Sequence, residues 1–564
     1  MAVMTLAEAA AHVTSTDPRF ALGRATIRGV DLPVFANAPA SLRDVMAVGA
    51  AARAELPDGG DYIIYEGERI TYAAWQSETF RIAHALVADL SVQPGDRVAI
   101  AMRNYPEYLS LMMAIASVGA VVVMVNAWWT TDELRYGFED SGAKIVFADG
   151  PRADSIRPFA AEFGLRIIGV RDGAGDAHYD ALLAGSANDA PPDIPIDPDA
   201  DFAVMYSSGT TGHPKGVVLT HRGAITALYS WFMGFSLMPL MVEEMPPPTA
   251  ARQTLLVTTP FFHITATHPC FLLSLPLGAK IVLMHKWDPE KAVRLVEAEE
   301  VTRFLAVPTM SADLTDAAVR MGATLKTLSN LSAGGAKRPA AQVLEQDKAL
   351  PHVAIASGYG MTESNALGLG ISGPEYAARP ESAGRLYPPI QEIKIADEAG
   401  DSLPNGEVGE ICLKSATIMR CYLNKPEATA EVLRDGWLHT GDLGRIDDEG
   451  YVEIVDRKKN IIIRGGENIS CLEVEGAIHK HPAVTEAAVF PVPHERLNET
   501  VGAAVQLKPG AHLGEDELRD HLAPLLAKFK WPEQVWWTGD TLIRGATDKT
   551  DRRAIRAACL EGRL

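Results

Sequence analysis

The sequence predicts an α/β protein with a large N-terminal domain of helix-flanked β-sheets and a small, mobile α+β C-terminal domain. Short β-branched runs alternate with helical segments from about residue 60 to about residue 460, and the pattern changes after about residue 456. Such alternation is typical of parallel sheets covered by helices. A chain of 564 residues, 47% of them hydrophobic and 22% charged, is long enough for more than one folded core.

The first sheet is predicted from five consecutive segments. Their order is strand, helix, strand, helix and strand, over Gly95–Met102, Tyr105–Ser117, Ala120–Asn126, Thr131–Ser141 and Ala143–Asp149. Residues 171–200, rich in Gly, Ala, Asp and Pro, are expected to form a linker or surface excursion, and Glu243–Arg252 a loop.

Two long apolar stretches, Gly223–Val242 and Ile264–Met284, are each expected to form a buried helix rather than an integral membrane segment. Both contain glycine and proline, and Glu243 and Glu244 follow the first stretch directly. An alternative for the first stretch is an apolar wall for a hydrophobic substrate, or weak contact with a membrane surface.

The C-terminal domain is predicted to begin at a basic, glycine-containing stretch. We place the boundary so that residues 1–456 form the first domain and residues 457–564 the second. The second domain is expected to contain a helix, two strands and a helix, over Cys471–Lys480, Val484–Val492, Val501–Leu507 and Glu515–Leu526.

The formal net charge of −20 argues against nucleic acid as a partner, because nucleic-acid binding requires a basic face. The five cysteines form no CxxC pair and no zinc-ligand spacing, which favours reduced thiols in a cytoplasmic protein. The N-terminus has no basic leader before an apolar run, so a secretory signal is not expected.

A loop dense in Gly, Ser and Thr, Tyr206–Gly216, lies between two apolar strands. Its backbone N–H groups and hydroxyls suit phosphate oxygens, and Lys215 adds a positive charge. It is not a Walker loop, because no Gly-Lys-Ser/Thr follows at the required spacing. The candidate phosphate-binding residues are Ser207, Ser208, Gly209, Thr210, Thr211, Gly212 and Lys215.

This loop closely resembles the signature of the adenylate-forming superfamily, which contains acyl-CoA synthetases, adenylation domains and beetle luciferases. Further segments resemble the family's motifs in the same order: Ser332–Ala336, Gly358–Glu363, Thr440–Gly444, Asp456–Lys459 and Arg464–Asn468. The resemblance implies that the nucleotide is bound by Gly334, Gly335, Ala336, Gly358, Tyr359, Gly360, Asp442, Ile454, Arg457, Lys459, Gly465 and Gly466, with the ring of Tyr359 on adenine and Asp442 on the ribose.

The implied reaction joins a carboxylate to the α-phosphate of ATP, so two anions must meet and the site must supply positive charge. The resemblance assigns Glu363 to Mg²⁺ and Thr362 to the α-phosphate, and a carboxylate is a natural Mg²⁺ ligand. His263, after a strand at Thr254–Thr258, borders the acyl pocket in the family. It is interpreted as a pocket-lining residue, with a general base as the alternative.

Lys549 matches the family's catalytic lysine, which reaches across the domain interface to both reactants. The residue before it is Asp548 where the family has glycine, and this departure predicts slow adenylation. Lys459 is the expected pivot of a hinge that moves the small domain between two half-reactions.

The predicted function is acid–thiol ligation: a hydrophobic carboxylic acid, ATP and coenzyme A give an acyl-CoA, AMP and pyrophosphate through an acyl-adenylate. The alternatives are a free-standing adenylating enzyme that loads a carrier protein, a luciferase-like enzyme that no feature favours, and a nucleotide-binding protein with little turnover. The cofactors implied are ATP, Mg²⁺ and coenzyme A as co-substrate. A monomer or homodimer is expected, fatty, aryl and steroid side-chain acids remain open as substrates, and no cation is identified for a second carboxylate.

Overall fold

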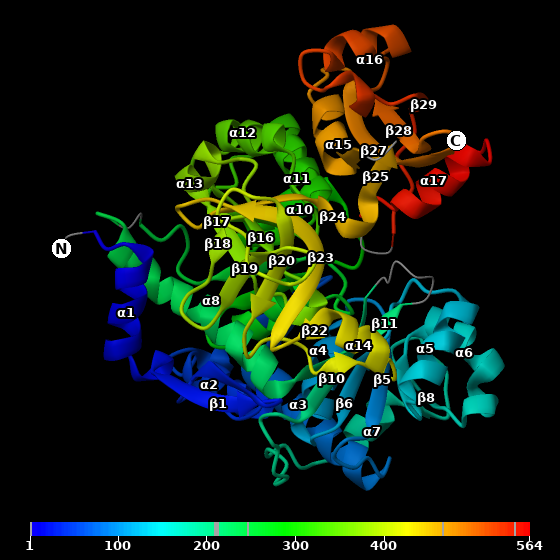
Figure 1. Ribbon diagram of the computed structural model, residues 1–564. Coiled ribbons are helices and arrows are strands. Elements are labelled where there is room, and N and C mark those ends of the chain that lie inside the picture. The colour runs from blue at the N-terminus through cyan, green and yellow to red at the C-terminus, as the bar shows by residue number, and fades with distance from the viewer. Residues whose placement is uncertain (1–2, 208–213, 245–246, 465–466, 546–548) are drawn as a thin grey trace.

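The computed structural model describes residues 3–207, 214–244, 247–464, 467–545 and 549–564. It contains two large, mostly parallel sheets that pack with helices on both faces, two smaller sheets beside them, and a fifth sheet in the C-terminal part (Figure 1). This arrangement confirms the predicted α/β class with a large N-terminal and a smaller C-terminal part.

The first large sheet has eight strands. Their spatial order is β21 (Cys421–Tyr422), β11 (Lys215–Thr220), β10 (Asp201–Ser207), β6 (Val121–Met124), β5 (Arg97–Ala101), β7 (Ile145–Ala148), β8 (Arg166–Gly169) and β9 (Ala177–His178). The strands from β10 through β6, β5, β7 and β8 to β9 run parallel, while β10, β11 and β21 pair antiparallel. Helices α5 (Thr131–Ser141) and α6 (Gly150–Phe163) cover its outer face through one apolar cluster.

The second large sheet has nine strands. Their order is β18 (Arg385–Leu386), β17 (Leu369–Ser372), β16 (Ala354–Tyr359), β15 (Asn330–Gly334), β14 (Arg303–Ala306), β12 (Thr254–Val257), β13 (Lys280–Leu283), β3 (Asp61–Tyr65) and β4 (Glu68–Thr71). Three helices cover its outer face: α10 (Pro289–Ala298), α11 (Pro308–Met321) and α12 (Ala340–Ala349).

The largest apolar core lies between these two sheets. It contains α2 (Leu42–Ala51), α3 (Tyr72–Ala88), α4 (Pro106–Ser117) and α8 (His221–Met241), whose buried side chains meet strands of both sheets. Alternating layers of helix and sheet therefore extend through the large domain, as in other α/β proteins. Helices α1 (Leu6–Thr16), α7 (Tyr179–Gly185), α9 (Ile264–Ala266), α13 (Gly373–Ala378) and α14 (Pro426–Val432) complete it, together with the hairpin of β1 (Leu22–Ile27) and β2 (Val30–Phe35).

A five-stranded antiparallel sheet connects the large domain to the last hundred residues. It contains β19 (Glu392–Ala396), β20 (Gly409–Lys414), β22 (Leu433–Arg434), β23 (Trp437–Ile446) and β24 (Val452–Arg457). After η5 (Lys458–Asn460), the chain enters the fifth sheet, of β25 (Ile461–Arg464), β26 (Glu467–Ser470), β27 (Val484–His494), β28 (Asn498–Leu507) and β29 (Gln534–Thr538). Helices α15 (Cys471–His479), α16 (Glu515–Leu522) and α17 (Arg552–Leu560) cover this sheet, at the upper right of Figure 1.

The structure refines one expectation from the sequence and overturns another. Residues 171–200 run mainly over the surface, as expected, but they also contain β9 and α7, and Tyr179 of α7 is buried and donates a hydrogen bond to Glu78 of α3 (2.6 Å). The stretch Ile264–Met284 is not one helix. It begins as α9 and a π-helical turn (Thr267–Leu272), passes through a turn that ends at Gly278 with a φ of 62°, and ends as the buried strand β13.

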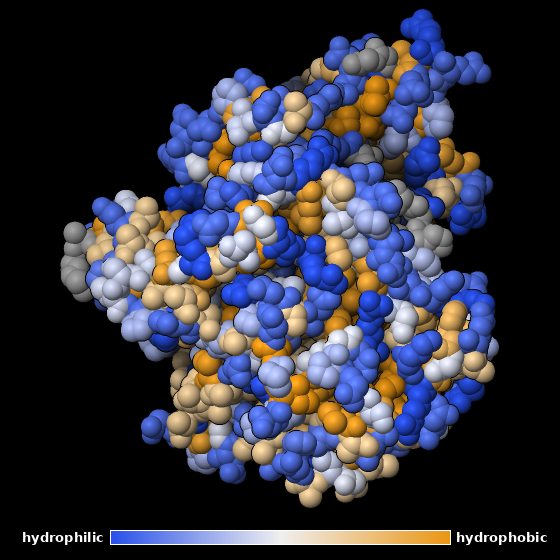
Figure 2. Space-filling model, turned by 60° about the horizontal axis from the view of Figure 1, so that its bottom comes forward, coloured by the Kyte–Doolittle hydropathy of each residue, from blue (hydrophilic) through white to orange (hydrophobic). Residues whose placement is uncertain are grey.

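The first apolar stretch does form a helix, α8. Among the described residues, α8 is long and apolar enough to cross a membrane by length and composition alone, but half of its most apolar window is buried inside the protein. Figure 2 shows mainly hydrophilic residues on one face of the molecule, with hydrophobic residues in several separate groups between them.

Candidate functional site

The base of the Gly/Ser/Thr loop is fixed by strands β10 and β11, which pair antiparallel and bring Ser207 opposite Lys215. The hydroxyl of Tyr206 donates to the carboxylate of Asp140 on α5 (3.0 Å), which anchors the end of β10. Five predicted phosphate-binding residues, Ser208, Gly209, Thr210, Thr211 and Gly212, lie outside the described residues, so their roles stay predictions.

Glu363 is buried beside this loop. Its Oε1 accepts a hydrogen bond from the hydroxyl of Tyr422 (2.7 Å), and the ammonium of Lys215 lies 4.7 Å from the centre of the Tyr422 ring. Burial raises the pKa of Glu363. Apart from its own backbone N–H, Tyr422 is the one described residue that donates to this carboxylate, so an oxygen lone pair remains for a cation.

This environment fits Mg²⁺. A magnesium ion bound to ATP takes one or two protein carboxylates and completes its shell with phosphate oxygens and water. Glu363, with one oxygen engaged by Tyr422 and a lone pair left for a cation, offers one such ligand. Thr362, next to it, opens a short 3₁₀ turn, Thr362–Ser364, and is half-buried.

The carboxyl ends of β15 and β16 form an open backbone platform. The strands pair in parallel with Gly334 opposite Gly358, and a side chain added at either glycine would meet no atom closer than 3.6 Å. At Gly360 an added Cβ would lie 2.1 Å from the carbonyl oxygen of Ala366, so only glycine fits there. A flat ring therefore has room to approach the two strand ends.

Three side chains connected by hydrogen bonds border this platform: Tyr359, Asp442 and Arg457. The hydroxyl of Tyr359 donates to Oδ2 of Asp442 (2.8 Å), and Nε of Arg457 donates to Oδ1 of the same carboxylate (3.0 Å). Asp442 is buried, whereas the side chain of Arg457 is 62% exposed. Ile454 lies on the same strand as Arg457, and its carbonyl accepts from Lys337 (3.4 Å).

Lys549 brings the C-terminal domain to the platform. A Cβ added at Gly335, whose φ is 80°, would lie 2.8 Å from Cε and 3.0 Å from Nζ of Lys549. The ammonium thus rests against the loop after β15, where Gly335 and Ala336 are exposed. Burial, together with the nearby charge of Arg457, lowers the pKa of Lys549 to about 8.

His263 begins α9 and is half-buried near Lys549. Burial, together with the Lys549 charge, lowers the pKa of His263 to about 3. A histidine with this pKa is neutral at physiological pH and is a weak base, which favours the pocket-lining interpretation over general-base catalysis. The neighbouring Phe261 and Phe262 are buried in the central core, beside His263.

The segment between the domains is held by a buried polar network. Lys458 donates to Oε2 of Glu410 (2.7 Å), which also contacts Nδ1 of His439 (3.0 Å). Oε1 of Glu410 accepts from the backbone N–H of Gly441 (2.9 Å), directly before Asp442. Glu410, Cys412 and His439 have their ligand atoms close enough for a metal ion, but the ammonium of Lys458 already supplies the positive charge.

Several predicted residues remain untested by geometry. Lys459 lies in η5, and Gly465, Gly466 and Asp548 lie outside the described residues.

Two residues of the site were not predicted from the sequence, Tyr422 and Glu410. Tyr422 donates to Glu363, and Glu410 accepts from the backbone N–H that precedes Asp442. Neither lies in a recognisable motif, and each becomes functional only through a partner distant in the sequence.

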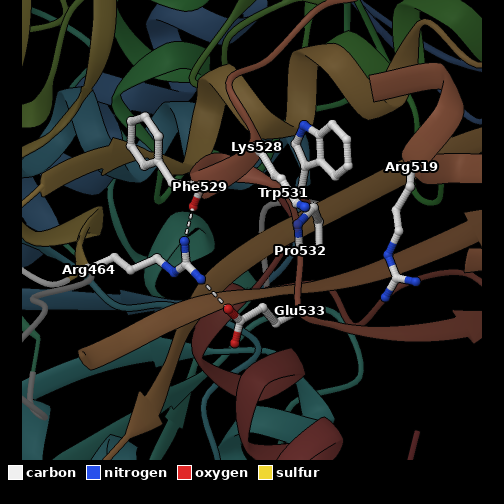
Figure 3. A pocket seen from close by; sticks show the side chains of 7 residues that line it. All are labelled: Arg464, Arg519, Lys528, Phe529, Trp531, Pro532 and Glu533. Carbon is white, nitrogen blue, oxygen red and sulfur yellow. Dashed lines mark hydrogen bonds and ion pairs between the residues drawn. The ribbon is translucent and has the colours of Figure 1, made fainter. Parts of the chain in front are cut away.

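An open depression lies elsewhere, on the C-terminal domain (Figure 3). It has a volume of about 500 Å³ and is lined by Arg464, Arg519, Lys528, Phe529, Trp531, Pro532 and Glu533. Arg464 is already engaged there, because it donates to the carbonyl of Phe529 (2.8 Å) and pairs with Glu533. Apart from Arg464, which directly precedes Gly465, this pocket contains none of the motif residues, so we place the candidate active site at Lys549 and Gly335.

The chain matches two family models: "AMP-binding enzyme" over residues 49–423 and "AMP-binding enzyme C-terminal domain" over residues 473–549. It is 35% identical to feruloyl-CoA synthase of an Amycolatopsis species over 487 residues, which are 86% of this chain and 93% of the relative. It is 30% identical to 4-coumarate–CoA ligase of Vanilla planifolia over 503 residues, 87% and 88% of the two chains.

Solved structures show the same similarity. ATP-bound MatB from Rhodopseudomonas palustris superposes with a TM-score of 0.80 at 29% identity and covers 92% of this chain and 100% of its own. A Mycobacterium tuberculosis fatty acyl CoA synthetase gives a TM-score of 0.70 at 28% identity, with coverage of 92% and 98%. The ordered motifs, the site geometry and these matches lead to one conclusion: the chain belongs to the AMP-binding enzyme family of adenylate-forming enzymes.

Proposed function

We propose that this enzyme is an AMP-forming acyl-CoA synthetase. It joins a carboxylic acid to AMP with release of pyrophosphate, and then transfers the acyl group to the thiol of coenzyme A with release of AMP. The observation that carries the proposal is Lys549 seated against Gly335, within reach of the nucleotide platform and of His263. The named relatives, which are CoA synthases and ligases, support the choice of coenzyme A over a carrier protein.

In the first half-reaction a carboxylate oxygen attacks the α-phosphorus, and the bond from this phosphorus to the pyrophosphate oxygen breaks. Both reactants are anionic, so the charge of Lys549 and the donors of the β10–β11 loop lower the barrier. Mg²⁺, held by Glu363, would neutralise phosphate charge. Tyr359, Asp442 and Arg457 border the nucleotide side and orient it.

In the second half-reaction the thiol sulfur attacks the acyl carbonyl carbon, AMP leaves, and the thiol proton passes to solvent. Lys549 rests against Gly335, where the acyl-adenylate would form, so it must withdraw before a thiol can approach. A rotation of the C-terminal domain about the segment at Lys459 would accomplish this.

The acid that we propose has an apolar body. Trp231, Phe232 and Phe235 of α8 are half-buried and pack against the central core, and Leu305 of β14 lies 3.6 Å from the Cβ position of Gly334. Helix α8 and β14 thus present partly buried apolar side chains beside the core, which suits an acid with a hydrophobic chain or ring.

The test is acid-dependent exchange of pyrophosphate into ATP, followed by thioester detection after addition of coenzyme A. Lys549→Ala should reduce exchange by about 10²–10³, the typical cost of removing one donor to a transition state. It should reduce transfer from a synthetic acyl-adenylate to coenzyme A much less. Lys508→Ala, at an exposed lysine of the same domain, is the matched control.

Normal exchange in Lys549→Ala would remove the assigned role of this lysine. Exchange without thioester formation would favour a carrier protein as acceptor, and no exchange with any acid would favour a nucleotide-binding protein without turnover.

A further inference from the structure

Arg303 lies in the middle of the second large sheet with its side chain toward α8. On β14, Phe304 and Ala306 are buried in the cluster beneath α10 and α11, while Arg303 and Leu305 occupy the opposite face and are only half-buried. The guanidinium of Arg303 lies 5.0 Å from the centre of the Phe235 ring of α8. A charged side chain therefore borders the apolar wall proposed for the acyl group.

Within the part of the chain that the structure describes, the guanidinium of Arg303 has no counter-ion. It makes no hydrogen bond and no ion pair there, and the groups that influence it electrostatically are Cys270 and Tyr387. Burial raises the pKa of Cys270 to about 12 and raises that of Tyr387 too, so both are neutral at physiological pH. A charge that is partly removed from water is costly when it is unpaired, and such charges are usually paired.

The buried arginine Arg53 provides the contrast. It is fully buried, and its guanidinium donates to four backbone carbonyls, those of Gly49, Ser274, Leu275 and Ala279. Arg303 has none of these partners and keeps accessible surface, so room for an acceptor remains beside it.

A second donor lies on the neighbouring strand. Asn330 of β15 is directly opposite Arg303 in the parallel register, and its side-chain oxygen accepts from the hydroxyl of Ser332 (2.5 Å). In the described structure the amide NH₂ of Asn330 makes no hydrogen bond. Arg303 and Asn330 thus place donors side by side without an acceptor between them.

The spacing connects this pair to the reaction centre. Along β15, Gly334 lies four positions beyond Asn330, which is about 13 Å at 3.3 Å per residue. Gly334 directly precedes Gly335, against which Lys549 rests. An extended acid that is activated at Lys549 and lies along β15 would bring its far end to Arg303.

We infer that Arg303, with Asn330, recognises an oxygen acceptor, a carboxylate above all, at the end of the acid remote from the activated carboxylate. This inference rests on the proposed function and narrows its substrate class to acids with an apolar body and an oxygen-bearing far end. Planar, bidentate pairing with a carboxylate is the contact for which arginine is best suited.

The test compares acids matched in length: octanedioate against octanoate, and 4-carboxycinnamate against 4-methylcinnamate, with 4-methoxycinnamate as a neutral acceptor. The readout is kcat/KM for acid-dependent pyrophosphate exchange. The native enzyme should favour the dicarboxylate of each pair by at least about tenfold, because an unpaired buried donor penalises the apolar analogue. Arg303→Met should remove or reverse this ratio, and Arg303→Lys should keep part of it.

Arg294→Met, at an exposed arginine of α10, should leave the ratio unchanged. A thermal melt of each variant separates loss of recognition from loss of folding. A native preference for the apolar acids, or an unchanged ratio in Arg303→Met, would overturn the inference and leave the ligase proposal intact. If the enzyme prefers 4-methoxycinnamate to both 4-carboxycinnamate and 4-methylcinnamate, the far end of the acid is recognised through a neutral oxygen acceptor. The proposed preference for a carboxylate would then be wrong. Absence of exchange with every acid would overturn the proposed function itself.

Discussion

At the scale of single residues, the proposed chemistry depends on the pKa of Lys549, which its burial and a neighbouring charge determine. Lys549 has its pKa lowered to about 8 by burial and by the charge of Arg457. Arg457 is itself held by Asp442, which also accepts from Tyr359. In the proposed mechanism, Arg457 therefore serves two purposes: it borders the nucleotide, and its charge lowers the pKa of Lys549.

This coupling predicts a pH dependence. The ammonium form of Lys549 is the active form, so adenylation should be full below pH 8 and fall as the pH rises through about 8. Arg457→Met removes a nearby positive charge, which raises the pKa of Lys549 and should shift this decline to higher pH. The measurement is kcat/KM for ATP in adenylation against pH, because this ratio reports ionisation of the free enzyme.

Arg445→Met, on the exposed side of β23, is the control and should keep the native profile. A decline at the same pH in Arg457→Met would contradict the electrostatic link, even if the KM for ATP rises because Asp442 has lost a partner.

At the scale of elements, the connection between the domains is short and held on both sides. β24 ends at Arg457, η5 spans Lys458–Asn460, and β25 begins at Ile461. Oδ2 of Asp456 accepts from the Ser470 hydroxyl (2.7 Å) and from the Leu472 N–H (3.1 Å) at the start of α15. Lys458 is fixed to Glu410 of the large domain, so few backbone bonds remain to absorb a rotation.

Lys459→Pro tests the hinge. Proline fixes φ near −65° and prevents the rotation that the second half-reaction requires. Pyrophosphate exchange should stay near the native level, while acyl-CoA formation should fall by tenfold or more. The control is Lys459→Ala, which removes the same side chain without fixing φ. This variant should retain both activities. Equal loss of both steps in Lys459→Pro would count against a hinge at this position.

At the scale of the whole molecule, the active site is complete only where the two domains meet. Lys549 comes from the last segment before α17, whereas Gly335 follows β15 of the nine-stranded sheet. Among the described residues, the polar contacts at residues 456–472 and Lys549 connect two separately packed cores. In the proposed mechanism, the position of the C-terminal domain decides which half-reaction is available.

Gly335→Ala tests this arrangement. The new methyl group would stand 2.8 Å from Cε of Lys549 on a backbone with φ of 80°, so Lys549 must move away. Adenylation should fall by at least about tenfold, and thioester formation from a synthetic acyl-adenylate should fall less. Gly322→Ala, at a left-handed helix end with no neighbour within 4 Å, controls for backbone strain. Equal losses in both steps would indicate a general defect in nucleotide binding.

The sequence predicted regular elements well where local pattern dominates. The helix expected over Thr131–Ser141 is α5 with the same ends, because Thr130 and Glu133 form a capping box and Gly142 ends the helix in the left-handed conformation. It failed where tertiary contacts decide, as in α7, whose Tyr179 is buried against α3 in a stretch of polar and small residues. It also failed at Ile264–Met284, where apolar composition did not distinguish a strand from a helix.

The sequence by itself determined the chemistry: ordered glycine-rich and acidic motifs, and a lysine near the C-terminus, suffice for nucleotide-dependent activation of an acid. Only the tertiary structure decided how these groups meet. Lys549 against Gly335, Tyr422 on Glu363 and Arg303 opposite Asn330 are contacts between segments far apart in the chain. Local pattern specifies what a residue can do, whereas burial and packing across domains specify its charge, its partners and the acid that it meets.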